Sequence, residues 1–195
     1  MPMTPDSRFA WMLVPLLSVF SACSTLPQYV RHTDPLTPEQ HVQLGASYEA
    51  QGLTESAVEQ YDAAIRLSKE YLPARIARGN LAFGSGDLKT AAACYRQVLR
   101  LDPNHAGANN NLAMVYLALG KHLDRAERYA LTALEQGGPL RPYILETLAE
   151  LYVREYRNEE AQKALDDSEA ATPSKDEPLR QQIAVTKQLL ELNRN

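Results

Sequence analysis

The sequence predicts an all-α chain built from repeated pairs of antiparallel helices. Residues 79–103, GNLAFGSGDLKTAAACYRQVLRLDP, have the pattern of the second half of one helix, a tight Gly-Ser-Gly-Asp turn, a second helix and a proline stop. The same pattern recurs before and after this segment with a period of about 34 residues. Small residues recur where the two helices of each pair would touch. A fixed period of this length is typical of helical repeat proteins.

Composition indicates a folded chain and excludes some functions. Of the 195 residues, 45% are hydrophobic and 23% are charged, which is ordinary globular usage. The net charge of −4, without a basic stripe, argues against nucleic acid as a partner. The two cysteines, Cys23 and Cys94, lie in very different contexts, so we expect no disulfide framework.

The first part of the chain has the pattern of a signal peptide. Residues 9–20, FAWMLVPLLSVF, are apolar apart from Ser18 and too few to cross a bilayer as an ordinary helix. Small residues then precede Cys23, and this arrangement resembles the lipobox of bacterial lipoproteins. The resemblance implies cleavage before Cys23 and acylation of that residue, with palmitate-type chains as the anchor. The alternative is a plain secretory leader, cut near Ala22, in which Cys23 has no special role.

The segment after the cysteine predicts a tether and a destination. Residues 24–36 contain Pro27 and Pro35 and have no helical period, so we expect a flexible linker. Ser24 follows the cysteine where some lipoproteins carry an aspartate that retains them in the inner membrane. By that resemblance the protein is anchored in the outer membrane and faces the periplasm. We therefore predict a signal peptide at 1–22, a lipidated cysteine and tether at 23–36, and a helical domain at 37–195.

The helical domain begins with a clear start signal. Thr37 offers an N-cap, Pro38 suits the first helical position, and Gln40 completes a capping box. Downstream of this start, small and aromatic residues occupy the signature positions of a known repeat: Gly45, Tyr48, Ala57, Tyr61 and Ala64. This pattern resembles the tetratricopeptide repeat (TPR). The resemblance implies a right-handed superhelix of helix-turn-helix units.

Three further units follow in register. We predict repeats at about 38–71, 72–105, 106–141 and 142–175, and a C-terminal capping helix at 176–195 with an apolar inner face and a polar outer face. That last helix should begin with a capping box from Ser174 to Glu177. Its apolar face should contain Leu179, Ile183 and Leu190, with Val185 as a fourth candidate.

Two arginines of the second repeat depart from the pattern. Arg75 and Arg78 stand where large apolar residues are usual. Either their stems lie along the helix with the charged ends in solvent, which is the interpretation we favour, or they pair with acidic neighbours.

The sequence shows no active site. The histidines, at 32, 41, 105 and 122, have no metal-ligand spacing, and we interpret each as a solvated surface residue. Cys94 lies within a packing helix and has no evident histidine partner, so we interpret it as a small buried hydrophobe. We therefore expect no catalysis, no metal, no cofactor and no small-molecule substrate.

The remaining candidate is a binding surface. In TPR proteins the first helix of each repeat lines a concave groove. The asparagines at the matching positions here could pair with the backbone of an extended peptide, with apolar pockets between them. The alternative is that the Asn109–Asn111 run is merely tolerated near a helix start. The basic residues with which some TPR proteins clamp a C-terminal carboxylate are missing. The resemblance assigns these groove residues: Asn80, Phe83, Asn110, Asn111, Met114, Leu117, Tyr143, Glu146, Glu150 and Arg154.

These features together predict a non-enzymatic scaffold. The chain resembles the small, pilotin-like TPR lipoproteins that assist assembly of type IV and tight-adherence pili and their secretin channels. The resemblance implies an outer-membrane lipoprotein whose groove binds a protein partner. An adaptor for peptidoglycan hydrolases, or for another cell-envelope machine, is the alternative. A hydrolase or transferase that uses unrecognised residues is a third hypothesis.

Overall fold

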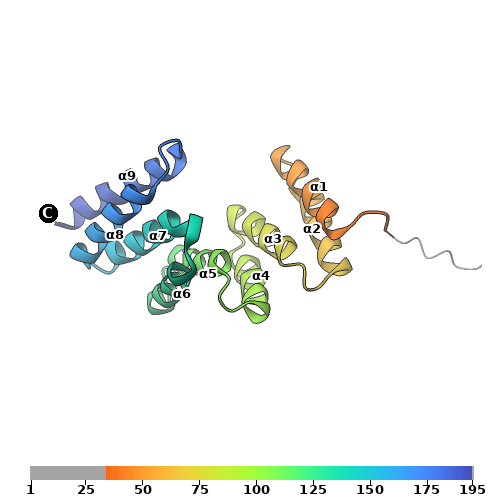
Figure 1. The fold of residues 1–195 in the computed structure, drawn as a ribbon, viewed down its shortest axis with the longest axis horizontal. Coiled ribbons are helices and arrows are strands. Elements are labelled where there is room, and N and C mark those ends of the chain that lie inside the picture. Colours follow the sequence, from red (N-terminus) through yellow and green to blue (C-terminus); the bar gives the residue numbers. More distant parts are fainter. Residues whose placement is uncertain (1–33, 195) are drawn as a thin grey trace, which may run out of the picture. The chain divides into compact units, whose positions relative to one another are not determined.

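The computed structural model describes residues 34–194, and helices are the only regular structure in that range (Figure 1). The leader, Cys23 and most of the predicted tether lie outside the described residues. The described helices are α1 (Pro38–Ala50), α2 (Thr54–Leu67), α3 (Leu72–Gly84), α4 (Leu88–Leu101), α5 (Ala106–Leu119), α6 (Leu123–Gln136), a short 3-10 turn η1 (Gly138–Leu140), α7 (Arg141–Arg154), α8 (Asn158–Ala171) and α9 (Glu177–Arg194).

The helices between residues 36 and 194 pack as consecutive pairs. The most extensive contacts join α1 to α2, α3 to α4, α5 to α6 and α7 to α8, and smaller contacts join each pair to the next. Helix α9 packs on both α7 and α8. The predicted all-α repeat fold is confirmed by this arrangement. In the range that the structure covers, no helix combines the length and apolar character needed to cross a bilayer.

Side-chain caps account for where α1 and α4 begin. Thr37 caps α1 with the predicted box: the Gln40 N–H donates to Thr37 Oγ1 at 3.3 Å, and the Thr37 N–H donates to Gln40 Oε1 at 2.8 Å. The Asp87 carboxylate accepts the Thr90 N–H at 3.0 Å and caps α4 with this single bond. Each cap satisfies backbone donors that a helix start would otherwise leave unpaired.

Glycine at the helix contacts is required by an aromatic ring on the paired helix. A Cβ built on Gly45 would lie 2.5 Å from Cε1 of Tyr61, and one built on Gly79 would lie 2.6 Å from Cε1 of Tyr95. Both tyrosines are 1% exposed. Any larger residue at either glycine would push the two helices of that pair apart.

The last helix differs from its prediction at both its start and its outer face. Asp176, rather than Ser174, caps it, because its Oδ1 accepts the Leu179 N–H at 3.3 Å. Leu179, Ile183 and Leu190 are buried as expected, but Thr186 is the fourth buried residue. Val185 is 55% exposed, and Leu189 and Leu192 are exposed too, so the outer face is partly apolar.

Three side chains have partners or burial that the sequence interpretation did not favour. Arg78 pairs with Asp62 at 3.4 Å, and Arg75 bonds to the Lys69 carbonyl and to Gln97, so neither simply extends into solvent. His41 is 4% exposed and its Nδ1 lies 2.8 Å from Gln60 Oε1, which corrects its assignment as a surface residue.

Cys94 is buried as predicted, and burial raises the pKa of its thiol. A thiol with a raised pKa is a poor nucleophile, so this residue has a packing role.

Candidate functional site

One pocket brings together four of the ten predicted groove residues. It encloses about 270 Å³ between α3, α4 and α5. Helix α3 contributes Asn80, Phe83 and Gly84, helix α4 contributes Tyr95, and helix α5 contributes Asn111 and Met114.

Helix geometry explains why these residues meet. Asn80 and Phe83 are three residues apart on α3, and Asn111 and Met114 are three apart on α5, so each pair projects from one face of its helix. Gly84 ends α3 and has no side chain, which leaves that edge of the pocket open.

A small hydrogen-bond network orders the polar side of the pocket. The Tyr95 hydroxyl donates to Asn80 Oδ1 at 2.9 Å, and Asn111 Nδ2 donates to the same oxygen at 2.9 Å. Burial raises the pKa of Tyr95 well above its ordinary value, so the phenol stays neutral and keeps its proton for this bond. The network fixes both amides against each other across α3 and α5.

The two amides keep unused hydrogen-bonding groups. Among the described residues, Asn80 Nδ2 and Asn111 Oδ1 have no hydrogen-bond partner, so one donor and one acceptor remain. A peptide group offers the matching acceptor and donor. Phe83 and Met114 line the same pocket and can receive an apolar side chain. The arrangement suits a short extended peptide with an apolar residue.

Two other predicted groove residues on α5 are buried in the packing. Leu117 is 2% exposed and belongs to the core, so it cannot provide a pocket wall. Asn110 is 7% exposed; its Nδ2 lies 3.5 Å from Met114 Sδ, and its Oδ1 is buried without a hydrogen-bond partner. Both assignments are corrected, because these side chains are buried on a helix that packs against α4, α6 and α7.

The asparagine run therefore divides into three roles. Asn109 Nδ2 donates to the carbonyls of Pro103 and His105 at 2.9 and 3.2 Å, so this side chain closes the turn before α5. Asn110 is buried, and Asn111 alone lines the pocket.

The last helix covers Glu146, which corrects its assignment to an open groove. Glu146 is 1% exposed and lies against α9, where Gln182 Nε2 donates to its Oε2 at 2.6 Å and Thr186 Oγ1 donates to its Oε1 at 2.8 Å. Burial raises the pKa of Glu146 to about 7, although the Thr186 hydrogen bond opposes that rise.

The other predicted residues of α7 take part in contacts within the domain. Arg154 donates to the Leu117 carbonyl at 2.8 Å and pairs with Glu150 at 2.6 Å, so it ties α7 to α5. Tyr143 is 39% exposed, and its hydroxyl donates to Asp176 ahead of α9. None of the three lines the pocket.

The sequence interpretation missed Tyr95 and Gly84 as parts of the pocket. Tyr95 stands at a repeat position that predicts packing, and nothing in the sequence indicated that its hydroxyl reaches Asn80, fifteen residues earlier. Within residues 34–194 no cluster of histidine, cysteine and carboxylate side chains could hold a metal ion.

Comparison with known families identifies tetratricopeptide repeats in two parts of the chain. Residues 41–71 match a family described as tetratricopeptide repeat, and residues 79–120 match one described as TPR repeat. The predicted repeat type is confirmed by these matches. No enzyme family is indicated, and repeats of this type are generally non-catalytic scaffolds suited to binding proteins. A search of curated proteins found no significant match.

Solved structures share the fold at low sequence identity. A thermophilic TPR protein from Thermus thermophilus is 26% identical with a TM-score of 0.64, covering 80% of this chain and 84% of that one. PilF of Pseudomonas aeruginosa is 22% identical with a TM-score of 0.67, covering 80% of this chain and 69% of that one. A tetratricopeptide repeat protein from Parabacteroides merdae is 19% identical with a TM-score of 0.67, covering 82% of this chain and 61% of that one.

Proposed function

We propose that this TPR chain is a non-enzymatic scaffold that holds a short extended segment of a partner protein in the pocket between α3, α4 and α5. The observation that carries the proposal is the pair of amides: Asn80 and Asn111 are fixed against each other, yet each keeps one unused hydrogen-bonding group. Beside them, Phe83 and Met114 offer apolar walls. Amides bind a peptide backbone irrespective of its sequence, and the apolar walls select a side chain.

The proposed setting is the periplasmic face of the bacterial outer membrane. Its support is the leader at 1–22, the small residues before Cys23, and the lipobox that they resemble. An acyl anchor binds membranes strongly, because each buried methylene contributes about 0.8 kcal/mol. From this position the protein would assist assembly of a pilus or secretin-type complex. The likeness to PilF is one of fold, so the pilus assignment rests on the sequence resemblance.

Fractionation of cells tests the anchor. Cys23→Ala should move the protein from the membrane fraction to the soluble periplasm, because the acylated thiol is lost. Cys94→Ala is the matched control, since Cys94 is buried in the helical domain and should leave the distribution unchanged. Membrane association that persists in the Cys23→Ala protein would reject the lipid anchor.

Crosslinking in intact cells, followed by mass spectrometry, tests the scaffold and its partner. Met114→Arg should fill the pocket and reduce capture of the partner about tenfold or more, without changing helicity or the melting temperature. Lys163→Glu, on an exposed position of α8, is the control and should capture normally.

The identity of the captured protein distinguishes the two envelope roles. Secretin or pilus subunits support pilus assembly, whereas cell-wall hydrolases support the adaptor alternative. Equal capture by wild-type and Met114→Arg proteins would contradict the pocket as the binding site.

A further inference from the structure

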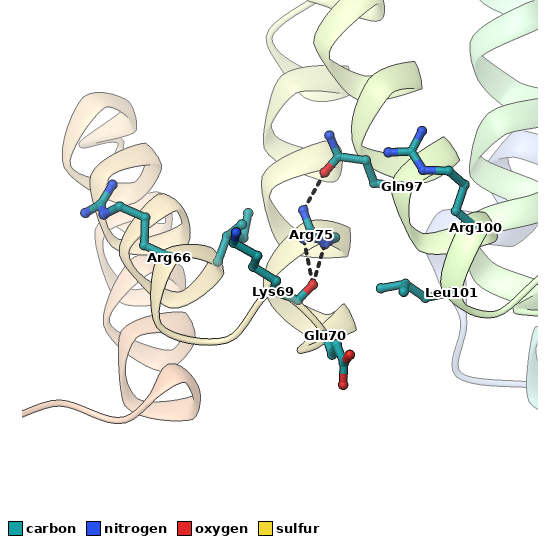
Figure 2. A pocket seen from close by; sticks show the side chains of 8 residues that line it. Arg66, Lys69, Glu70, Arg75, Gln97, Arg100 and Leu101 are labelled. Atoms are coloured by element: carbon teal, nitrogen blue, oxygen red, sulfur yellow. Dashed lines mark hydrogen bonds between the residues drawn. The ribbon is translucent and has the colours of Figure 1, made fainter.

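A second pocket lies where the first two helix pairs meet, away from the pocket proposed for peptide binding. It is an open depression with a volume of about 540 Å³, lined by the end of α2, the loop that follows, α3 and the end of α4 (Figure 2). The lining residues are Ile65, Arg66, Lys69, Glu70, Arg75, Gln97, Arg100 and Leu101.

The charge around this pocket is opposite to that of the whole chain. Four cationic side chains and one carboxylate, that of Glu70, line the pocket, although the whole chain has a net charge of −4. Figure 2 shows the Glu70 carboxylate directed away from Arg75. An excess of positive charge in a concave site focuses the electrostatic potential and attracts anionic groups.

One cation is held rigidly at the centre of the pocket. Arg75 donates through Nε and Nη2 to the Lys69 carbonyl, at 3.2 and 2.6 Å, and through Nη1 to Gln97 Oε1 (Figure 2). Both acceptors are uncharged, so the guanidinium charge is positioned without being neutralised. A positioned charge loses little conformational entropy when it meets a ligand.

The other three cations have no acidic partner. Arg66, Lys69 and Arg100 are exposed and form no ion pair within residues 34–194. Arg66 and Arg100 lie in the last turns of α2 and α4, where a cation is favourable to the helix dipole. The helix dipole explains why each arginine lies at a helix end, but it does not explain why both arginines line the same pocket. The last turns of α6 and α8 hold no cation, so the later helix pairs do not repeat the feature.

The lining of the pocket is partly apolar. Ile65 and Leu101 line it, and Leu101 is 50% exposed. An anionic ligand would therefore bind more tightly if it carried an apolar side chain next to its carboxylates. Nucleic acid would need a longer basic track than one pocket provides, and a membrane surface is too flat to enter a pocket.

We propose that this basic pocket, formed by Arg66, Lys69, Arg75 and Arg100, binds an acidic segment of a protein partner, with carboxylates on the cations and an apolar residue over Ile65 and Leu101. The site is separate from the pocket between α3, α4 and α5. The protein would thus present two peptide-binding sites of different chemistry, one neutral and one cationic.

The test measures binding of a fluorescein-labelled peptide, in which a central leucine is flanked by glutamates and aspartates, to the full-length protein in non-ionic detergent. A second peptide, with glutamine and asparagine in place of the acids, is the charge control. The acidic peptide should bind at least about tenfold more tightly than its amide version. Its affinity should fall as salt rises from about 50 to about 300 mM, because these charges are exposed to solvent.

Charge reversal locates the site. Arg66→Glu with Arg100→Glu should weaken binding of the acidic peptide about tenfold or more. Lys121→Glu with Lys163→Glu makes the same change in net charge at exposed positions elsewhere and should leave binding within about twofold. Unchanged melting temperatures would show that both double variants fold.

Three results would overturn the proposal. The first is an equal loss of binding in both double variants, which would show that the peptide responds only to the overall charge of the protein. The second is equal affinity for the acidic and amide peptides. The third is Arg66- and Arg100-dependent binding of phosphatidylglycerol vesicles without binding of the peptide, which would assign the pocket to a lipid surface.

Discussion

At the scale of single residues, Tyr156 occupies a backbone conformation that suits glycine. Its φ is 59°, and the equivalent turns of the three preceding helix pairs place Gly52, Gly86 and Gly120 in the same left-handed region, with φ of 74°, 79° and 60°. A side chain in that region costs roughly 1–2 kcal/mol. Tyr156 is 74% exposed, so little packing offsets the cost.

Replacing this tyrosine with glycine should therefore stabilise the turn between α7 and α8. We expect Tyr156→Gly to exceed Tyr156→Ala in unfolding free energy by about 0.5–1 kcal/mol, since both lose the ring but only glycine removes the strain. Chemical denaturation of the two variants measures the difference. An alanine variant as stable as the glycine variant would contradict the strain at this residue.

At the scale of elements, the contact between α7 and α9 depends on the protonation of Glu146. Its carboxyl has a pKa of about 7 in the folded protein, against 4.5 ordinarily, because it is buried between these helices. A raised carboxyl pKa means that the folded state favours the neutral form. The stabilising contribution is complete below about pH 4.5 and is lost as the pH rises through about 7.

Glu146→Gln should remove this pH dependence while keeping a side-chain oxygen that can accept a hydrogen bond from Thr186 or Gln182. At pH 8 the variant should be more stable than wild type by about 2–3 kcal/mol, and near pH 4.5 the two should differ by less than about 0.5 kcal/mol. Denaturation across this pH range measures the difference, with the exposed Glu159→Gln as control. A Glu146→Gln effect that is constant with pH would show that the carboxyl does not titrate in this window.

At the scale of the whole molecule, the sequence was sufficient to predict the helix pairs. A repeat period, small residues at the helix contacts and the capping box of Thr37 with Gln40 are local signals that the structure places as expected, whereas the box predicted at Ser174 is replaced by a cap from Asp176. The contacts that these signals specify join neighbours in the chain, so the fold follows from them without any distant pairing.

The binding surface could be predicted only in part, because the exposure of a side chain depends on helices that are distant in the sequence. Asn80 and Asn111, 31 residues apart, were both predicted to line a groove, and the structure brings them into one pocket, because α3 and α5 are the first helices of neighbouring pairs. Glu146 was assigned to an open groove, but Gln182 and Thr186, 36 and 40 residues later, cover it. No repeat pattern contains that information, since α9 belongs to no helix pair.

The basic pocket was not predicted for a related reason. Arg75 was considered singly, as a departure from the repeat pattern, and its partners Lys69 and Gln97 lie on different elements. Two helix ends and one loop had to be placed before their charges could be seen to converge.

The most direct test of the scaffold account is site-specific photocrosslinking in intact cells, with a photoreactive amino acid placed at Met114 or, in a second strain, at Lys163. Met114 lines the pocket between α3, α4 and α5, and Lys163 is exposed on α8. We expect a defined partner protein to be crosslinked from position 114 but not from position 163. Adding Phe83→Ala should abolish the crosslink from position 114. A partner crosslinked from position 163 alone, or equally from both positions, would contradict the assignment of this pocket as the binding site.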